Sequence, residues 1–122
     1  MRDAGRRVVL VDDAADVRML LQLLLELEGF VVTATADGPA GLAAVRAAHP
    51  DVVLLDVQLP GMDGTEVLRA LRADPPTAQL PVVLLTGSPE QDTAALLGLG
   101  ATAVLRKPFD PDAVGAQLVA LL

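Results

Sequence analysis

The sequence contains no cysteine, no tryptophan and no tyrosine, and its aromatic side chains are limited to Phe30 and Phe109. Without cysteine there is no disulfide framework, no thiolate metal site and no cysteine nucleophile, which is compatible with the cytoplasm. With two aromatic side chains, a core must be built from Val, Leu and Ala. The chain has 122 residues, of which 52% are hydrophobic. This is enough to bury a core in one domain that spans residues 1–122.

Basic charge is scarce, because 9 Lys and Arg face 16 Asp and Glu and leave a formal net charge of -7. An acidic chain is repelled by phosphate backbones, so we expect no direct binding to nucleic acid. Solubility alone is an equally good explanation of the acidity.

Long hydrophobic runs are missing too. The most apolar stretch, residues 19–27, is interrupted by Gln22 and Glu26 and falls far short of the roughly 20 residues that a membrane span requires. Four apolar residues separate Arg7 from Asp12, too few for the core of a signal peptide. We expect a soluble cytoplasmic protein that does not contact membranes.

Short aliphatic runs predict five strands. They lie at residues 8–11, 30–34, 52–55, 82–85 and 103–105, and the second is slightly more polar than the others. Runs without polar alternation are typical of parallel strands that are buried on both faces of a sheet.

Between the strands, helical spacing predicts five helices. The first should bury one stripe and end at Gly29; the stripe consists of Val17, Leu20, Leu21, Leu24 and Leu27. The second lies between Asp37 and Pro50, and the third ends before Pro75.

A fourth helix is expected to open at Ser88, with Pro89 and Gln91 completing a capping-box pattern. A fifth opens at Asp110 and runs to Leu122. Five strands that alternate with five helices predict an α/β fold, a doubly wound parallel sheet with helices on both faces.

Ligands of such sheets bind beyond the carboxyl ends of the strands, and reactive side chains follow four of the five runs: Asp12 and Asp13, Asp56, Thr86, and Lys107. Taken singly, an Asp in this place is more often a helix cap than a functional group. Three gathered carboxylates repel one another unless a cation lies among them, and oxygen ligands favour Mg²⁺ over zinc. Thr86 and Lys107 would then hold a phosphoryl group from the other side.

Four motifs at these positions, at residues 9–13, 55–64, 85–87 and 105–109, make the chain resemble the receiver domains of two-component response regulators (CheY-like). The resemblance covers essentially the whole chain and implies the strand order 2-1-3-4-5. It also implies that the Lys107–Pro108 peptide bond is cis.

The resemblance further implies that Asp56 is the phosphoacceptor for a histidine kinase or a histidine phosphotransfer protein. Thr86 and Lys107 would hold phosphoryl oxygens. The implied Mg²⁺ ligands are Asp12 (through water), Asp13, Asp56 and the backbone carbonyl of Val57. Such a domain is not an enzyme in the ordinary sense, because it assists its own phosphorylation and dephosphorylation.

Val104 stands where receivers commonly carry the aromatic residue that reports phosphorylation. This departure keeps open an alternative function, a phosphorylation-independent interaction module with the receiver fold. An aspartate phosphatase would need an acid at Gln58, and a nucleotide-binding site would need a glycine-rich loop after the first strand.

The expected partners beyond the kinase are a downstream protein target or a fused effector. Met19 and Leu23 lie outside the predicted buried stripe of the first helix, where they suit docking of a kinase or phosphotransfer protein. We expect a monomer or a weak dimer, with an apolar contact through Leu96, Leu99, Val119 and Ala120 as the possible dimer surface.

Overall fold

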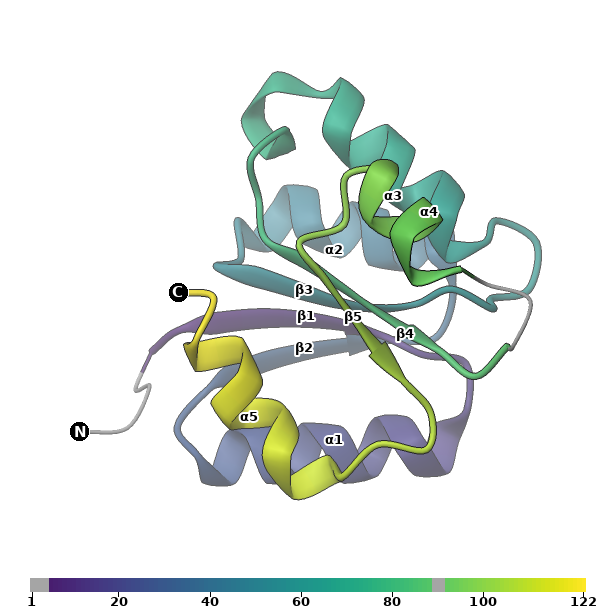
Figure 1. Cartoon of the computed structure of the whole chain (residues 1–122). Helices are drawn as coiled ribbons and strands as arrows, with labels where there is room; N and C mark the ends of the chain where they lie inside the picture. The colour runs from purple at the N-terminus through teal and green to yellow at the C-terminus, as the bar shows by residue number, and fades with distance from the viewer. Residues whose placement is uncertain (1–4, 89–91) are drawn as a thin grey trace.

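A computed structural model describes residues 5–88 and 92–122, which form one five-stranded parallel sheet flanked by helices (Figure 1). The strands are β1 (Arg7–Val11), β2 (Val31–Thr35), β3 (Val52–Asp56), β4 (Val82–Thr86) and β5 (Ala103–Arg106). The helices are α1 (Ala15–Leu27), α2 (Gly38–Ala48), α3 (Gly64–Ala73), the short 3₁₀ helix η1 (Pro75–Thr77), α4 (Thr93–Gly98) and α5 (Pro111–Val119). The spatial order of the strands is β2-β1-β3-β4-β5, as the resemblance implied.

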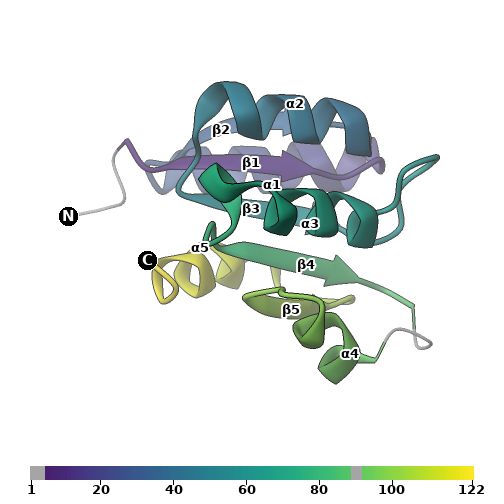
Figure 2. The same ribbon diagram turned by 90° about the horizontal axis from the view of Figure 1, so that it is seen from above.

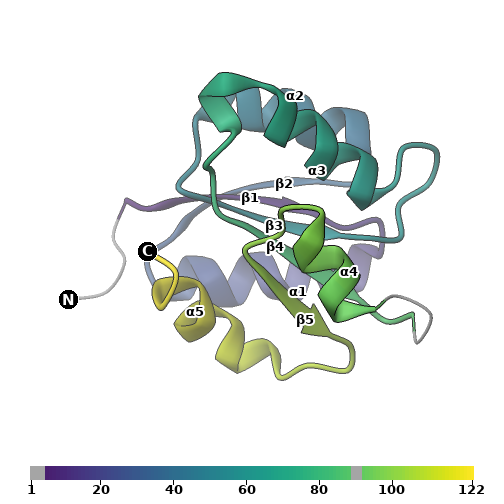
Figure 3. The same ribbon diagram turned by 45° about the horizontal axis from the view of Figure 1, so that its top comes forward.

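Each face of the sheet carries its own hydrophobic core. Helices α1 and α5 lie side by side on one face, and α2, α3 and α4 cover the other (Figures 1 and 3). Successive side chains of β1 alternate between the two cores. Val8 and Leu10 pack with α1 and α5, whereas Val9 and Val11 pack with α2 and α3.

The central strands are the most deeply buried. Every residue of β3 and β4 is buried, as are the last four of β1, which agrees with their uninterrupted aliphatic runs. The outer strands β2 and β5 are partly exposed, and Val31 of β2 is 53% exposed. Their edge positions explain why these two runs are the more polar and the weaker ones.

The buried stripe of α1 differs from the prediction. Leu21 and Leu25 are buried, whereas Leu20 is 44% and Leu27 is 62% exposed. The helix is so rich in leucine that several stripes fit its sequence, and the position of the sheet selects one of them. The predicted end is confirmed, since Gly29 adopts a positive φ of 101° and the N–H of Phe30 returns to the Leu25 carbonyl at 3.1 Å.

An aspartate caps the N-terminus of each of the helices α2, α4 and α5. Asp37 accepts a hydrogen bond from the Ala40 N–H at 2.8 Å, and Asp110 caps α5 as predicted, although α5 ends at Val119 rather than Leu122. The predicted start of the fourth helix at Ser88 is wrong, because α4 begins at Thr93 with Asp92 as its cap. The rest of the expected capping box, Pro89 and Gln91, lies outside the described residues.

No helix in the part of the chain that the structure describes is both long enough and apolar enough to cross a bilayer.

Candidate functional site

The side chains singled out by the sequence meet at one edge of the sheet. All five strands are parallel, so their carboxyl ends share this edge (Figure 2). Asp12 and Asp13 directly follow β1, while Asp56 and Thr86 are the last residues of β3 and β4. Lys107 directly follows β5. The structure therefore brings all five predicted side chains to one edge.

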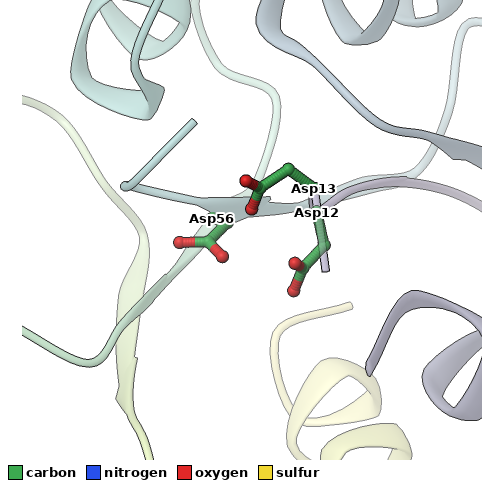
Figure 4. A group of neighbouring side chains, drawn as sticks. All are labelled: Asp12, Asp13 and Asp56. Carbon is green, nitrogen blue, oxygen red and sulfur yellow. The ribbon is translucent and has the colours of Figure 1, made fainter. Parts of the chain in front are cut away.

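Three carboxylates form the centre of the site. Oxygen atoms of Asp12, Asp13 and Asp56 lie within 4.8 Å of one another (Figure 4). Asp12 is fully buried and Asp56 is 3% exposed, whereas Asp13 is exposed to solvent. Two of the three carboxylates have thus lost most of their hydration, which makes their mutual repulsion expensive.

Asp12 has one satisfied and one unsatisfied carboxylate oxygen. Oδ1 accepts a hydrogen bond from the Ala14 N–H at 2.9 Å, while Oδ2 is buried and has no hydrogen-bond partner among the described residues. The Lys107 ammonium lies 3.8 Å from Oδ2. Burial raises the pKa of Asp12, and the nearby charge of Asp56 adds to this effect.

Asp56 is held from two directions. Its Oδ1 accepts a hydrogen bond from the Gln58 N–H at 2.9 Å, and its Oδ2 lies 2.9 Å from the ammonium of Lys107. Burial alone would lower the pKa of Lys107, but the hydrogen bond and charge of Asp56, with the charges of the other two carboxylates, raise it overall. Lys107 is therefore a protonated ammonium at neutral pH.

Thr86 is linked to Lys107 through the main chain. The Thr86 carbonyl accepts a hydrogen bond from the Lys107 N–H at 2.7 Å, and the following Lys107–Pro108 bond is cis, as the resemblance implied. The Thr86 side chain is fully buried, and its hydroxyl oxygen accepts a hydrogen bond from the Ser88 N–H at 3.2 Å. Within the described residues, no acceptor is seen for the hydroxyl proton of Thr86.

A divalent cation with a preference for oxygen ligands fits this arrangement. The donor set consists of three carboxylates, and the buried Oδ2 of Asp12 has an unmet need for a positive partner. The Val57 carbonyl accepts a hydrogen bond from the Gly64 N–H at 2.8 Å, which occupies one of its two lone pairs. Its expected role as an ion ligand stays a prediction.

The backbone around Asp56 depends on a glycine whose role the sequence did not reveal. A Cβ atom on Gly64, the first residue of α3, would lie 2.3 Å from the Asp56 carbonyl oxygen and 2.7 Å from the Val57 Cα. Helix α3 therefore begins in direct contact with the main chain of the central aspartate.

Comparison with known proteins agrees with this geometry. A family model described as the response regulator receiver domain matches residues 8–119. This chain belongs to the response regulator receiver family. It is a receiver domain of a two-component system, and both the fold and the motifs are those expected from the resemblance.

The matched relatives are longer proteins. The DNA-binding response regulator MtrA of Mycobacterium leprae is 42% identical over 120 residues, which are 96% of this chain and 51% of the relative. The transcriptional regulatory protein CseB of Streptomyces coelicolor is 40% identical over 116 residues, 94% of this chain and 48% of the relative. The receiver domain thus spans about half the length of the curated relatives it matches.

Solved structures with the same fold are of similar length. Chemotaxis protein CheY4 of Vibrio cholerae has a TM-score of 0.89 and 32% identity and covers 98% of this chain and 100% of its own. A CheY-like receiver domain protein from Methanospirillum hungatei has a TM-score of 0.88 and 26% identity, covering 97% and 94%.

Two surfaces of the receiver domain bear on the partner predictions. Leu96 is 2% exposed and belongs to the core, so the predicted apolar dimer contact cannot include it; Val119 is 40% exposed. By contrast, Met19 is 67% and Leu23 is 55% exposed, which confirms that these side chains of α1 lie outside the core.

Proposed function

We propose that this receiver domain accepts a phosphoryl group on Asp56, in a Mg²⁺-dependent transfer from a histidine kinase or a histidine phosphotransfer protein. The observation that carries the proposal is the pairing of buried Asp56 with Lys107, beside the unpartnered Oδ2 of Asp12. The Asp56 carboxylate, the Lys107 ammonium and a cluster of carboxylates suited to a cation lie together. Phosphoryl transfer needs a nucleophile and positive charges that neutralise the phosphoryl oxygens.

The transfer requires that Asp56 and the phosphohistidine be placed in line and that the charge on the phosphoryl oxygens be neutralised. An oxygen of Asp56 attacks phosphorus, the bond between phosphorus and the histidine nitrogen breaks, and its electron pair stays on the imidazole. Because Asp56 is a carboxylate paired with an ammonium, it needs no general base. The Lys107 ammonium would exchange its hydrogen bond to the Asp56 oxygen for one to a phosphoryl oxygen. The Thr86 hydroxyl would donate a hydrogen bond to a second phosphoryl oxygen.

Asp12, Asp13 and Asp56 would hold the cation. When bound, Mg²⁺ would neutralise charge that develops on the phosphoryl oxygens and relieve the repulsion among the three carboxylates. The donor set and the orphaned oxygen of Asp12 support this assignment.

We place the kinase or phosphotransfer protein on the side of the site formed by α1. A cavity of about 200 Å³ lies next to Lys107 and is lined by Val17, Leu20, Leu21, Lys107, Pro108, Phe109 and Pro111. The exposed Met19 and Leu23 add further apolar side chains on another side of the same helix. A partner that docks there would bring its phosphohistidine close to Asp56.

The output follows from a change in protein binding. We propose that a downstream protein or a fused effector reads the phosphorylated state, that the domain acts in the cytoplasm, and that it is a monomer or weak dimer. It is a phosphoacceptor that assists its own phosphorylation and dephosphorylation rather than an enzyme acting on other molecules. Two matched relatives are named as DNA-binding or transcriptional regulators, which supports an output in transcription.

The test is incubation with Mg²⁺ and a small acyl phosphate, followed by mass spectrometry. The expected product carries one phosphoryl group, is released by hydroxylamine as an acyl phosphate should be, and does not form in Asp56→Asn. Asp112→Asn, an exposed aspartate in the first turn of α5, is the matched control and should react normally. Phosphorylation that persists in Asp56→Asn would refute the assignment.

The alternative, a phosphorylation-independent interaction module, gives a different result. Its affinity for a partner would be equal with and without Mg²⁺ and the phosphoryl mimic beryllofluoride. The proposed switch requires these affinities to differ.

A further inference from the structure

Asp12 is held by three neighbours that come from three parts of the fold. Its N–H donates to the Thr35 carbonyl of β2 at 3.1 Å, and its Oδ1 accepts from the Ala14 N–H of the following loop at 2.9 Å. Its backbone carbonyl accepts a hydrogen bond from Nη1 of Arg18, the fourth residue of α1, at 2.9 Å. These bonds satisfy every polar atom of Asp12 except Oδ2. This oxygen is buried beside the carboxylates of Asp13 and Asp56.

The bond from Arg18 fixes the peptide unit that joins Asp12 to Asp13. The direction of the Asp13 side chain depends on this peptide, because Asp13 follows it immediately and is exposed to solvent rather than packed in a core. If the peptide rotated, the backbone of Asp13 would shift and its carboxylate would move relative to Asp12, whose own side chain is held by the Ala14 N–H. Small displacements of ligands weaken a cation site with strict geometry, such as one for Mg²⁺.

We propose that Arg18 is a positioning residue for the cation site. The inference rests on the proposed function, since it concerns the cation that phosphorylation of Asp56 requires. Arg18 is a donor and cannot be a ligand of a cation. It acts through its hydrogen bond to the Asp12 carbonyl, which keeps the Asp13 carboxylate close to that of Asp12 in the cation site.

The charge of Arg18 makes the proposal sharply testable. A positive side chain near the cluster disfavours a second cation, so a purely electrostatic role predicts that loss of Arg18 strengthens Mg²⁺ binding. A positioning role predicts the opposite sign. The direction of the change in Mg²⁺ affinity therefore separates the two roles.

The experiment is a titration with Mg²⁺ alone, followed by amide chemical shifts in NMR, on the wild type, Arg18→Met and Arg46→Met. Methionine keeps the unbranched stem of arginine without its charge or donors. Arg46 lies in the last turn of α2, on the opposite face of the sheet from α1, and serves as the matched charge control. We expect Arg18→Met to bind Mg²⁺ roughly 10-fold more weakly, whereas Arg46→Met should bind it as tightly as the wild type or slightly more tightly.

A second readout uses phosphorylation by the small acyl phosphate. Arg18→Met should need a correspondingly higher Mg²⁺ concentration for its half-maximal rate, while the rate at saturating Mg²⁺ stays close to that of the wild type. A merely structural role would lower the melting temperature and leave the Mg²⁺ affinity of the folded protein unchanged.

Equal or tighter Mg²⁺ binding by Arg18→Met than by Arg46→Met would overturn the inference. Should Arg18→Met not fold, Arg18→Lys takes its place, because lysine keeps the charge but cannot reproduce the planar fork of donors; weaker Mg²⁺ binding supports the inference and wild-type binding overturns it. If the wild type itself binds no Mg²⁺, the proposed function fails at the same time. If it binds Mg²⁺ and Arg18 has no effect, the inference about Arg18 fails alone.

Discussion

The ammonium of Lys107 lies 2.9 Å from Oδ2 of Asp56, and Lys107 is also the single lysine of the sequence. The side chain of Lys107 is 29% exposed, so reagents in solution can reach it. A chemical label that attacks side-chain amines therefore reports on this one ion pair. It offers a view of the site that does not depend on a phosphodonor or a partner.

The first prediction concerns the reactivity of Lys107. Burial lowers the pKa of Lys107, and the bond to Asp56 contributes to its net rise. In Asp56→Asn the pKa of Lys107 should fall, and more of the amine is then unprotonated at a pH below the ordinary lysine value of about 10.4. We expect acylation of Lys107 by an N-hydroxysuccinimide ester to be several-fold faster in Asp56→Asn, measured by peptide mass spectrometry.

Asp112→Asn is the control for the labelling, because it removes one exposed acidic charge from α5 and leaves the ion pair in place. Its Lys107 should react at the wild-type rate. Equal rates in all three proteins would mean that Asp56 does not hold Lys107 in solution.

The second prediction concerns the buried charge of Asp12. Its Oδ1 is satisfied by Ala14 and its Oδ2 is not, so the ionised form is stabilised poorly. Asparagine keeps the hydrogen bond from Ala14 and removes the charge. Without Mg²⁺, Asp12→Asn should raise the melting temperature by several degrees, since ~1 kcal/mol corresponds to about 3–6 °C in a domain of this size. Thermal unfolding followed by circular dichroism in the presence of a chelator measures this.

The gain should depend on pH. Burial raises the pKa of Asp12 above 3.8, so the folded state binds this proton more tightly than the unfolded state. The contribution of Asp12 to stability is fully present below 3.8 and is lost as the pH rises through the folded pKa. The difference in melting temperature between Asp12→Asn and the wild type should therefore grow with pH across this window. Asp13→Asn, at an exposed position, should change the melting temperature less; no gain in Asp12→Asn would mean that the cluster is not strained.

The third prediction concerns Gly64. A methyl group there would meet the Asp56 carbonyl at 2.3 Å, a contact with backbone that no side-chain rotation can relieve. Gly64→Ala should be destabilised by roughly 1–3 kcal/mol, the range for overpacking a core, and should phosphorylate slowly because the main chain of Asp56 must move. Denaturant unfolding and the acyl phosphate assay measure the two effects.

Gly98 provides the matched control for Gly64. It is the last residue of α4, and a Cβ atom there would meet nothing within 4 Å. Gly98→Ala should be neutral or slightly stabilising, because alanine favours the helical backbone. Comparable losses of stability in both variants would show that the close approach at Gly64 is not the cause.

The sequence was sufficient to predict the sheet, and to predict that five polar side chains lie at one of its edges, for a physical reason. Aliphatic runs mark buried parallel strands, and a polar side chain at the end of such a run must lie at the carboxyl edge of the sheet. Asp56 and Thr86 follow this rule directly. Their mutual distances, and the unsatisfied Oδ2 of Asp12, depend on strand order and on loop paths, which the runs do not encode.

The features that could not be predicted arise where the sequence permits several solutions. Leu20, Leu25 and Leu27 of α1 are equally apolar, and contact with the sheet decides which one is buried. Leu96 was expected at the surface because the bounds of its helix were predicted wrongly; in the structure α4 spans only Thr93–Gly98 and turns Leu96 into the core. The bond from Arg18 to the Asp12 carbonyl has no sequence signal, since it needs a particular side-chain conformation in three dimensions.

The last prediction concerns Arg106, the final residue of β5. Its Nη1 donates to the Ser88 carbonyl and its Nε donates to the Thr93 hydroxyl, both at 3.1 Å, so it joins β5 to the segment after β4 and to the first residue of α4. A six-residue helix is not stable by itself and depends on such contacts.

Arg106→Met should therefore increase hydrogen exchange of the α4 amides. Each exposed hydrogen bond contributes ~0.5–1.5 kcal/mol, which corresponds to a change of roughly 2- to 10-fold in the opening equilibrium. The amides of β4, in the centre of the core, should exchange as in the wild type. NMR or mass spectrometry measures both sets at once, with Arg46→Met as the control for loss of one arginine charge. If α4 exchanges at the same rate in Arg106→Met and Arg46→Met, the contacts of Arg106 do not stabilise the helix, and core packing such as that of Leu96 holds it instead.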